Sequence, residues 1–326
     1  MMMTRTALAE VTSSMSATYG HRSVLLDECI EALNIRPDGI YVDGTLGMGG
    51  HSEEIARRLD TGRLIAIDRD EYALERAAER LAPYGDAVEL VHGNFRQLPE
   101  ILDELGVGRV DGMLFDLGVS SPQLDEPERG FSYRMDAPLD MRMDATESLT
   151  AWFVVNRWPE EKLRRILFDY GEERCAARIA AAIVQAREET DIDTTLQLVD
   201  VIKSAMPAAA LREKQHPAKR SFQAIRIAVN DELTAVSELM DTAPERLAPG
   251  GRLAVISFHS LEDRLVKTGI ARRENGCTCP RDFPVCVCGF VPTLKSVGKK
   301  PILPTPQELE ENPRARSAKL RVAQRV

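Results

Sequence analysis

Val42-Asp43-Gly44-Thr45-Leu46-Gly47-Met48-Gly49-Gly50-His51 is the stretch that decides the fold of this chain. It follows a strand-like run that begins at Ile40 and precedes a helix-like run that begins at Ser52. Glycines tolerate positive φ angles and let the backbone approach a ligand closely. The N-terminus of the following helix offers unpaired N–H groups with partial positive charge. The stretch therefore predicts a turn that binds a polar or anionic ligand.

The order of the glycines indicates which cofactor this turn binds. The dinucleotide fingerprint is G-x-G-x-x-G, whereas here Asp43 enters the turn and the glycines are spaced differently, which disfavours NAD. Asp68 ends the next apolar run and suits the two hydroxyls of a ribose. S-adenosylmethionine needs amide donors for its carboxylate, an acidic group for its ribose and an apolar slot for its adenine, and we expect it here. The alternative is an ordinary strand-to-helix turn with a solvated Asp68.

Composition indicates a soluble globular protein, which we expect in the cytoplasm, and the length suggests one large or two medium domains, of which we expect two. The chain has 326 residues, of which 44% are hydrophobic and 29% charged, and no run approaches the length of a membrane span. Residues 1–19 lack the apolar core of a signal peptide, and we expect a disordered tail there. The net charge of −9 argues against a protein that coats nucleic acid nonspecifically.

Basic residues nevertheless gather in two segments. One runs from Arg212 to Arg226 and includes Lys214, and the other follows Pro292. Such segments are either solvated faces or surfaces that contact RNA, and the charge alone does not decide between them.

Strand-like and helix-like runs alternate through the first part of the chain. We expect strands over the ranges 40–43, 64–68, 88–92 and 110–116, with helical patterns between them. This alternation predicts an α/β fold with a parallel sheet, in which ligands bind at the carboxyl ends of the strands. Asp43, Asp68, Phe95 and Asp116 fall at that edge.

The pattern becomes almost purely helical in the middle of the chain and then returns to α/β. We expect a long helix from Phe222 to Leu247, a strand over 252–257 and a last strand over 320–324. The chain is therefore divided into a core of residues 20–130 and 215–326 and an inserted α-helical domain of residues 131–214.

A polar loop, Asp116 to Gln123, follows the fourth expected strand. Enzymes that methylate exocyclic amino groups of bases carry a short loop there, and Ser121-Pro122 resembles its first half. The amine is a poor nucleophile because its lone pair is delocalised, so acceptors that bond its N–H groups in the transition state promote the reaction. We take Asp116, Ser120, Ser121 and Pro122 as catalytic candidates; the alternative is that Asp116 only caps a turn.

Many strings in a fixed order resemble the RsmH or MraW family of bacterial small-subunit rRNA cytosine-N4 methyltransferases, and the resemblance covers nearly everything after residue 20. The strings are His21-Arg22-Ser23-Val24-Leu25-Leu26, residues 43–51, Ala66-Ile67-Asp68-Arg69-Asp70, residues 116–123, Glu128-Arg129-Gly130-Phe131-Ser132, Pro138-Leu139-Asp140-Met141-Arg142-Met143-Asp144, Tyr170-Gly171-Glu172-Glu173-Arg174, Phe222-Gln223-Ala224-Ile225-Arg226-Ile227, Ser257-Phe258-His259-Ser260-Leu261-Glu262-Asp263-Arg264 and Asn312-Pro313-Arg314-Ala315-Arg316-Ser317.

The resemblance implies a Rossmann-like methyltransferase core with a helical insertion. It implies S-adenosylmethionine-dependent methylation of N4 of one cytidine in the decoding region of 16S rRNA, within the small ribosomal subunit. The cofactor contacts that it implies are Gly49, Gly50, His51, Asp68 on the ribose, Phe95 on adenine, and Asp116 and Gln123 beside the donor.

Several roles stay open at the level of sequence. Phe95 could equally be a core residue, and His259 is either near the RNA or a structural histidine. The alternatives to the rRNA enzyme are a methyltransferase that acts on a non-RNA substrate and a noncatalytic ribosome-assembly factor. The sequence carries no signal for an oligomeric state.

Four cysteines, Cys277, Cys279, Cys286 and Cys288, lie close together outside the strings that carry the resemblance. Four thiols suffice for a tetrahedral zinc site, although C-x-C is tighter than the usual C-x₂-C spacing. The alternatives are a reduced loop in a cytosolic protein and a redox-sensitive hairpin. On the sequence alone, no residue is assigned to a metal.

Overall fold

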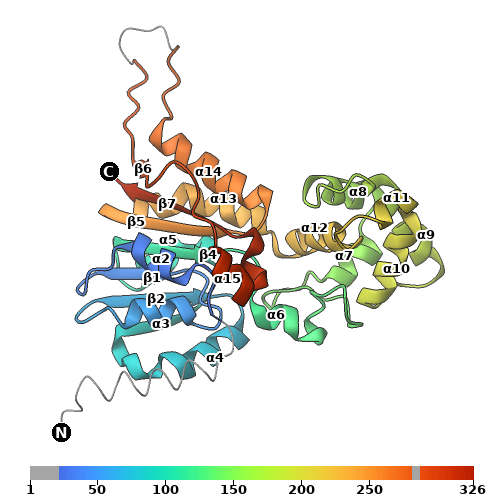
Figure 1. Cartoon of the computed structure of the whole chain (residues 1–326), viewed down its shortest axis with the longest axis horizontal. Coiled ribbons are helices and arrows are strands. Elements are labelled where there is room, and N and C mark those ends of the chain that lie inside the picture. Colours follow the sequence, from blue (N-terminus) through green and yellow to red (C-terminus); the bar gives the residue numbers. More distant parts are fainter. Residues whose placement is uncertain (1–21, 281–286) are drawn as a thin grey trace.

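The computed structural model describes residues 22–280 and 287–326, so the tail expected over residues 1–19 lies outside the described residues, as does Cys286. Seven strands of the described chain form one sheet with the order β3-β2-β1-β4-β5-β7-β6 (Figure 1). The strands are β1 (Ile40–Asp43), β2 (Arg63–Asp68), β3 (Val88–His92), β4 (Val110–Asp116), β5 (Leu247–Ser257), β6 (Leu294–Ser296) and β7 (Lys319–Arg325). The first five pair in parallel, and β7 runs antiparallel to β5 and β6.

Helices cover both faces of this sheet because successive strand residues point to opposite sides. Leu64 and Ala66 of β2 pack with one set of buried side chains, whereas Ile65 and Ile67 pack with the other. The first face carries α2 (Leu26–Leu33), α3 (Gly50–Ala56) and α4 (Glu71–Leu81), and the second carries α5 (Leu98–Glu104), α13 (Glu232–Thr242) and α14 (Ser260–Glu274). The Rossmann-like α/β core expected from the sequence is confirmed.

A helical part follows the short helix α6 (Ser121–Asp125) and lies beside the sheet (Figure 1). Its helices have their own buried cluster, to which the strands contribute no residue. They are α7 (Ala151–Arg157), α8 (Glu160–Asp169), α9 (Ala176–Glu189), α10 (Thr195–Ala205), α11 (Ala208–Leu211) and α12 (Lys219–Asn230). The helical insertion is therefore confirmed, while its limits at residues 131 and 214 stay a prediction.

The prediction of one long helix from Phe222 to Leu247 is wrong. The chain forms α12 and α13 instead, because Asp231 between them takes a left-handed conformation with φ of 48°. The remaining elements are α15 (Pro306–Glu311) and the 3₁₀ turns η1 (Ala82–Ala87), η2 (Phe95–Gln97), η3 (Pro127–Arg129), η4 (Ala243–Arg246) and η5 (Pro313–Ser317). Within the described ranges, no helix has the length and apolar character needed to cross a membrane.

The side chain of Asn230, at the end of α12, joins the helical part to the core. Its Nδ2 donates to the carbonyl of Met141 at 2.7 Å, and its Oδ1 accepts from the backbone N–H of Met143 at 2.8 Å. The same oxygen accepts from the guanidinium of Arg69, directly after β2, at 2.6 Å. One buried amide thus fixes the insertion against the strand end that carries Asp68.

We predict that Asn230→Ala lowers the free energy of unfolding by about 2 to 4 kcal/mol, because it leaves buried backbone groups without hydrogen-bond partners. Urea unfolding followed by circular dichroism measures this change. The control is Asn34→Gly at an exposed position where φ is 50°, a conformation that glycine tolerates, and its stability should match wild type. If the Asn230→Ala variant were as stable as wild type, Asn230 would not be the residue that fixes the helical part to the core.

Candidate functional site

The Gly-rich turn after β1 is fixed by hydrogen bonds to the carboxyl ends of the strands on either side. The N–H of Gly44 donates to the carbonyl of Leu114 in β4, and the N–H of Leu46 donates to the carbonyl of Ile67 in β2, both at 2.9 Å. The N–H of Gly47 donates to Oδ2 of Asp68 at 2.7 Å. The turn therefore spans three parallel strands, and its shape depends on all of them.

Glycine is required at several positions of this turn, for different reasons. Gly47 and Gly49 have φ angles of 50° and 75°, which favour glycine. A Cβ atom on Gly44 would lie 2.1 Å from the ring of Phe115, and one on Gly50 would lie 2.1 Å from Oγ of Ser23. The absence of side chains lets neighbouring groups approach the turn closely.

Two acids, Asp43 and Asp116, flank the turn. Asp43 is 1% exposed, and its carboxylate accepts from the hydroxyl of Ser52 at 2.7 Å and from the N–H of Thr45 at 3.2 Å. Burial raises the pKa of Asp43 to about 6. Burial, together with the charges of Asp43 and Glu262, raises the pKa of Asp116 well above its ordinary value.

One oxygen of Asp116 is positioned to act on a ligand. The backbone N–H of Asp116 donates to the hydroxyl of Thr45 at 2.6 Å, which fixes the residue against the turn. Its Oδ1 is buried and has no hydrogen-bond partner among the described residues. A buried acceptor without a partner costs free energy, so its retention points to a ligand that supplies a hydrogen bond or a positive charge.

Asp68 and Phe95 lie where the sequence places them, at the ends of β2 and β3. Oδ1 of Asp68 accepts from the N–H of Asp70 at 2.9 Å, in addition to the bond of Oδ2 with the turn. Each carboxylate oxygen keeps a further lone pair for a hydroxyl. The half-buried ring of Phe95 packs edge-on against Phe115, with ring centroids 5.8 Å apart.

The loop after β4 is braced by Gln123. Ser120 caps α6: its Oγ accepts from the N–H of Gln123 at 3.4 Å, and Oε1 of Gln123 accepts from the N–H of Ser120 at 3.0 Å. Nε2 of Gln123 donates to Asp70 at 2.8 Å, and Arg129 contacts the same carboxylate at 3.0 Å. The polar loop expected from Asp116 to Gln123 therefore ends at Ser120, because Ser121, Pro122 and Gln123 form the first turn of α6. Gln123 ties this turn to the end of β2.

Both histidines of interest have structural partners. His51 is 5% exposed and burial lowers its pKa to about 4, so its neutral ring donates from Nε2 to the carbonyl of Val24 at 3.0 Å. His259 caps α14, with Nδ1 accepting from the N–H of Glu262 at 3.4 Å. Its buried Nε2 lies 3.0 Å from Oε1 of Glu262 but forms no hydrogen bond with the described residues. These contacts favour the structural alternative for His259.

Arg226 corrects one expectation about the basic segment. Its guanidinium forms hydrogen bonds of 2.8 and 2.9 Å with Glu232, and both side chains are largely buried. Because its guanidinium is buried in this ion pair, Arg226 is not available to contact RNA. Arg212, Lys214 and Lys219, in contrast, are exposed.

Sequence reasoning also missed Thr45, Asp70 and Arg129 as parts of the site. Thr45 contacts both flanking acids, and Asp70 and Arg129 hold the loop after β4. The sequence carried a signal for each of them, because all three residues lie within the sequence strings that resemble the RsmH or MraW family.

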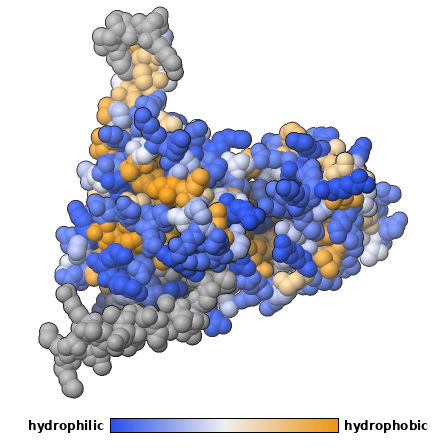
Figure 2. Space-filling model, viewed as in Figure 1, coloured by the Kyte–Doolittle hydropathy of each residue, from blue (hydrophilic) through white to orange (hydrophobic). Residues whose placement is uncertain are grey.

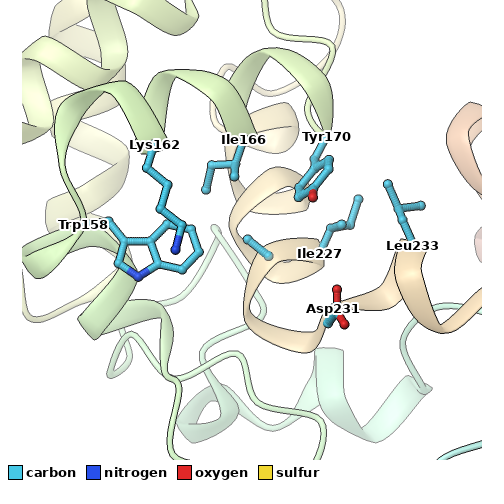
Figure 3. Close-up of a pocket in the computed structure, with 8 residues that line it drawn as sticks. Trp158, Lys162, Ile166, Tyr170, Ile227, Asp231 and Leu233 are labelled. Atoms are coloured by element: carbon cyan, nitrogen blue, oxygen red, sulfur yellow. The ribbon is translucent and has the colours of Figure 1, made fainter. Parts of the chain in front are cut away.

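A hollow of about 190 Å³ lies between α8 and the residues around Asp231, away from the strand edge (Figure 3). Lys162 places its Nζ 3.4 Å from the centre of the Trp158 ring on one side, and Tyr170 and Leu233 line the other. The residues predicted for catalysis and cofactor binding do not line this hollow.

Three features together fit S-adenosylmethionine. They are the Gly-rich turn hydrogen-bonded to β2 and β4, the carboxylate of Asp68 at the end of β2, and Oδ1 of Asp116 at the end of β4, which has no hydrogen-bond partner among the described residues. The fold and this site define an S-adenosylmethionine-dependent methyltransferase.

Comparison with known proteins is consistent with this class. The chain belongs to the MraW methylase family, whose sequence pattern matches residues 18–326. It is 57% identical to the ribosomal RNA small subunit methyltransferase H of Brevibacillus brevis over 95% of this chain and 99% of that protein. It is also 57% identical to the protein of the same name from Symbiobacterium thermophilum, over 93% of this chain and 96% of that protein. An rRNA methylase of known structure from Streptococcus thermophilus gives a TM-score of 0.40 at 13% identity, covering 92% of this chain and 93% of that one, a likeness too remote to carry an argument.

The raised pKa of Asp43 predicts a pH-dependent stability. Its folded-state pKa of about 6 exceeds the unfolded value of 3.8, so the folded state binds the proton more tightly. The resulting stabilisation is complete below about pH 4 and is lost as the pH rises through about 6, by about 3 kcal/mol.

Asp43→Asn should remove this pH-dependent loss of stability, because an amide keeps an acceptor for Thr45 and a donor for Ser52 without a charge. Urea unfolding of the ligand-free protein between pH 4 and 7 measures the free energy of unfolding at each pH. Asp60→Asn, at an exposed acid, should keep the wild-type profile. If the free energy of unfolding depended on pH in the same way in wild type and Asp43→Asn, the pH dependence would not come from Asp43.

Proposed function

We propose that this chain transfers the methyl group of S-adenosylmethionine to the N4 amino group of one cytidine in the decoding region of 16S rRNA. The observation that carries the proposal is Oδ1 of Asp116, a buried acceptor without a protein partner next to the loop of Ser120, Ser121 and Pro122. The relatives are named as methyltransferases of the small-subunit ribosomal RNA, which supports an rRNA substrate.

The residues at the strand edge fit the cofactor by their hydrogen-bonding groups and by charge. We assign its contacts to Gly49, Gly50, His51, Asp68, Phe95, Asp116 and Gln123. When bound, S-adenosylmethionine supplies a methyl group activated by a positively charged sulfonium. Asp43 and Asp116 place two carboxyl groups beside the turn, and the charge of Asp43 raises the pKa of Asp116. A cationic ligand relieves this repulsion, so the site favours the charged donor over its neutral product.

Asp116 acts on the nucleophile in this proposal. The lone pair of the N4 amine is delocalised into the cytosine ring, and it becomes available when the N–H groups are bonded to an acceptor in the transition state. Oδ1 of Asp116 supplies that acceptor, and Gln123 holds the backbone of Ser120 and the first turn of α6, with Ser121 and Pro122, in place. Aligning the two reactants can lower the barrier by about 7 to 11 kcal/mol, so no strong base is needed.

We assign RNA contact to exposed cations in both basic segments. Arg212, Lys214 and Lys219 are exposed near the start of α12, and Lys299 and Lys300 are exposed after β6. Aromatic residues make up only 5% of the chain, which disfavours a broad stacking surface and favours a single flipped cytosine in a pocket. We place the reaction in the cytoplasm, with residues 131–214 as an inserted domain and residues 20–130 and 215–326 as the catalytic core.

Asp116→Asn should lower kcat by about 10²-fold or more, because the amide replaces a charged acceptor at the reacting nitrogen. The assay measures methyl incorporation into small ribosomal subunits from cells that lack the gene, and mass spectrometry of the 16S rRNA locates the product. Asp60→Asn is the matched control. If deletion of the gene leaves N4-methylcytidine unchanged, the proposed reaction is wrong. If Asp116→Asn retains full activity, the reaction stands but its assigned acceptor does not.

A further inference from the structure

A segment between α14 and β6 projects away from the sheet (Figure 1). We call its described residues, 275–280 and 287–293, the arm. Hydrophobic residues are exposed along the arm (Figure 2), including Val287 and Val291, which are each 73% exposed. Burial of apolar surface therefore contributes little to holding the arm together, and another interaction is required.

The two legs of the arm face each other in a regular register. At its base, the N–H of Thr293 donates to the carbonyl of Arg273 at 3.0 Å. Three residues further along each leg, Gly276 lies against Phe290, where a Cβ atom would come within 2.7 Å of the ring. After another three residues, the N–H of Val287 donates to Sγ of Cys279 at 3.3 Å.

This register brings three cysteine sulfurs together from the two legs. Sγ of Cys277 and Sγ of Cys288 lie 3.6 Å apart, and the sulfurs of Cys277, Cys279 and Cys288 all lie within 4.8 Å of one another. When two sulfurs bind the same zinc ion at about 2.3 Å with the tetrahedral angle between them, the sulfurs lie about 3.8 Å apart. A disulfide bond would require about 2.05 Å.

We propose that Cys277, Cys279 and Cys288 bind a zinc ion as thiolates and that this ion fastens the two legs of the arm. Each thiol loses its proton to solvent when it binds the metal, with no change in oxidation state. The N–H of Val287 already donates to Cys279, and such a bond stabilises a thiolate. The fourth corner of the tetrahedron takes water or a further donor.

The site is independent of the proposed methyl transfer. The three cysteines lie outside the buried clusters of the sheet and of the helical part, so their replacement should leave the core folded. Thiolates favour zinc among the common divalent ions, whereas magnesium and calcium require oxygen ligands.

The test compares the metal content of three full-length proteins purified from zinc-supplied cells under reducing conditions. Wild type and Cys175→Ser, which replaces a cysteine in the helical part, should each hold about one zinc per chain. The triple variant Cys277→Ser, Cys279→Ser, Cys288→Ser should hold less than about a tenth of that. Circular dichroism should show a folded core in all three.

Cobalt(II) substitution gives a second readout that does not depend on activity. Wild type and Cys175→Ser should show a thiolate-to-cobalt charge-transfer band in the near ultraviolet, and the triple variant should lack it. Wild type without bound zinc, a disulfide at these positions in the protein as isolated, or zinc retained by the triple variant would each overturn the proposal.

Discussion

The hydrogen bonds between the Gly-rich turn and the strands beside it are the constraint on which the rest of the site depends. Gly44 is held by β4, Leu46 by β2, and Gly47 by the carboxylate of Asp68. These bonds require strands β1, β2 and β4 to be adjacent and parallel, which is the order that the sheet adopts. The turn that would hold the cofactor is thus a consequence of the sheet, and a change in strand order would abolish it.

The same bonds place acidic groups in a buried setting. Thr45 contacts both Asp43 and Asp116 from the middle of the turn: its N–H donates to the carboxylate of Asp43, and its hydroxyl accepts from the backbone N–H of Asp116. Desolvation and the charges of Asp43 and Glu262 raise the pKa of Asp116, and this unfavourable charge distribution is suited to a cationic ligand. The helical part contributes by bracing, through Asn230 at Arg69, and Gln123 of α6 braces Asp70 from within the core.

The sequence predicted the parts of the fold that depend on local pattern. The parallel strands were predictable because each is a short apolar run that ends at a polar residue, and the glycines were predictable because backbone geometry demands them. The break at Asp231 was not, because a left-handed aspartate depends on its surroundings, here an ion pair with Arg96 at 2.9 Å. The burial of Arg226 was equally hidden, since its partner Glu232 lies on the next helix.

Within the candidate site, sequence reasoning placed the residues but not their contacts. Asp68 and Asp116 had to meet the turn because all three fall at the carboxyl edge of the sheet. The bracing role of Gln123 was not visible, because it depends on Asp70 from another strand end. In the cysteine segment, spacing alone could not tell a metal site from a reduced loop, and the register of the two legs was needed.

The central claim, that the turn and its acids bind S-adenosylmethionine, is tested most directly by titration calorimetry of the purified chain with S-adenosylmethionine and with NAD. We expect saturable binding of S-adenosylmethionine to wild type, weaker binding to the Asp68→Ala and Asp116→Asn variants, and no binding of NAD. Binding of NAD alone, or equal affinity of all three proteins for S-adenosylmethionine, would contradict it.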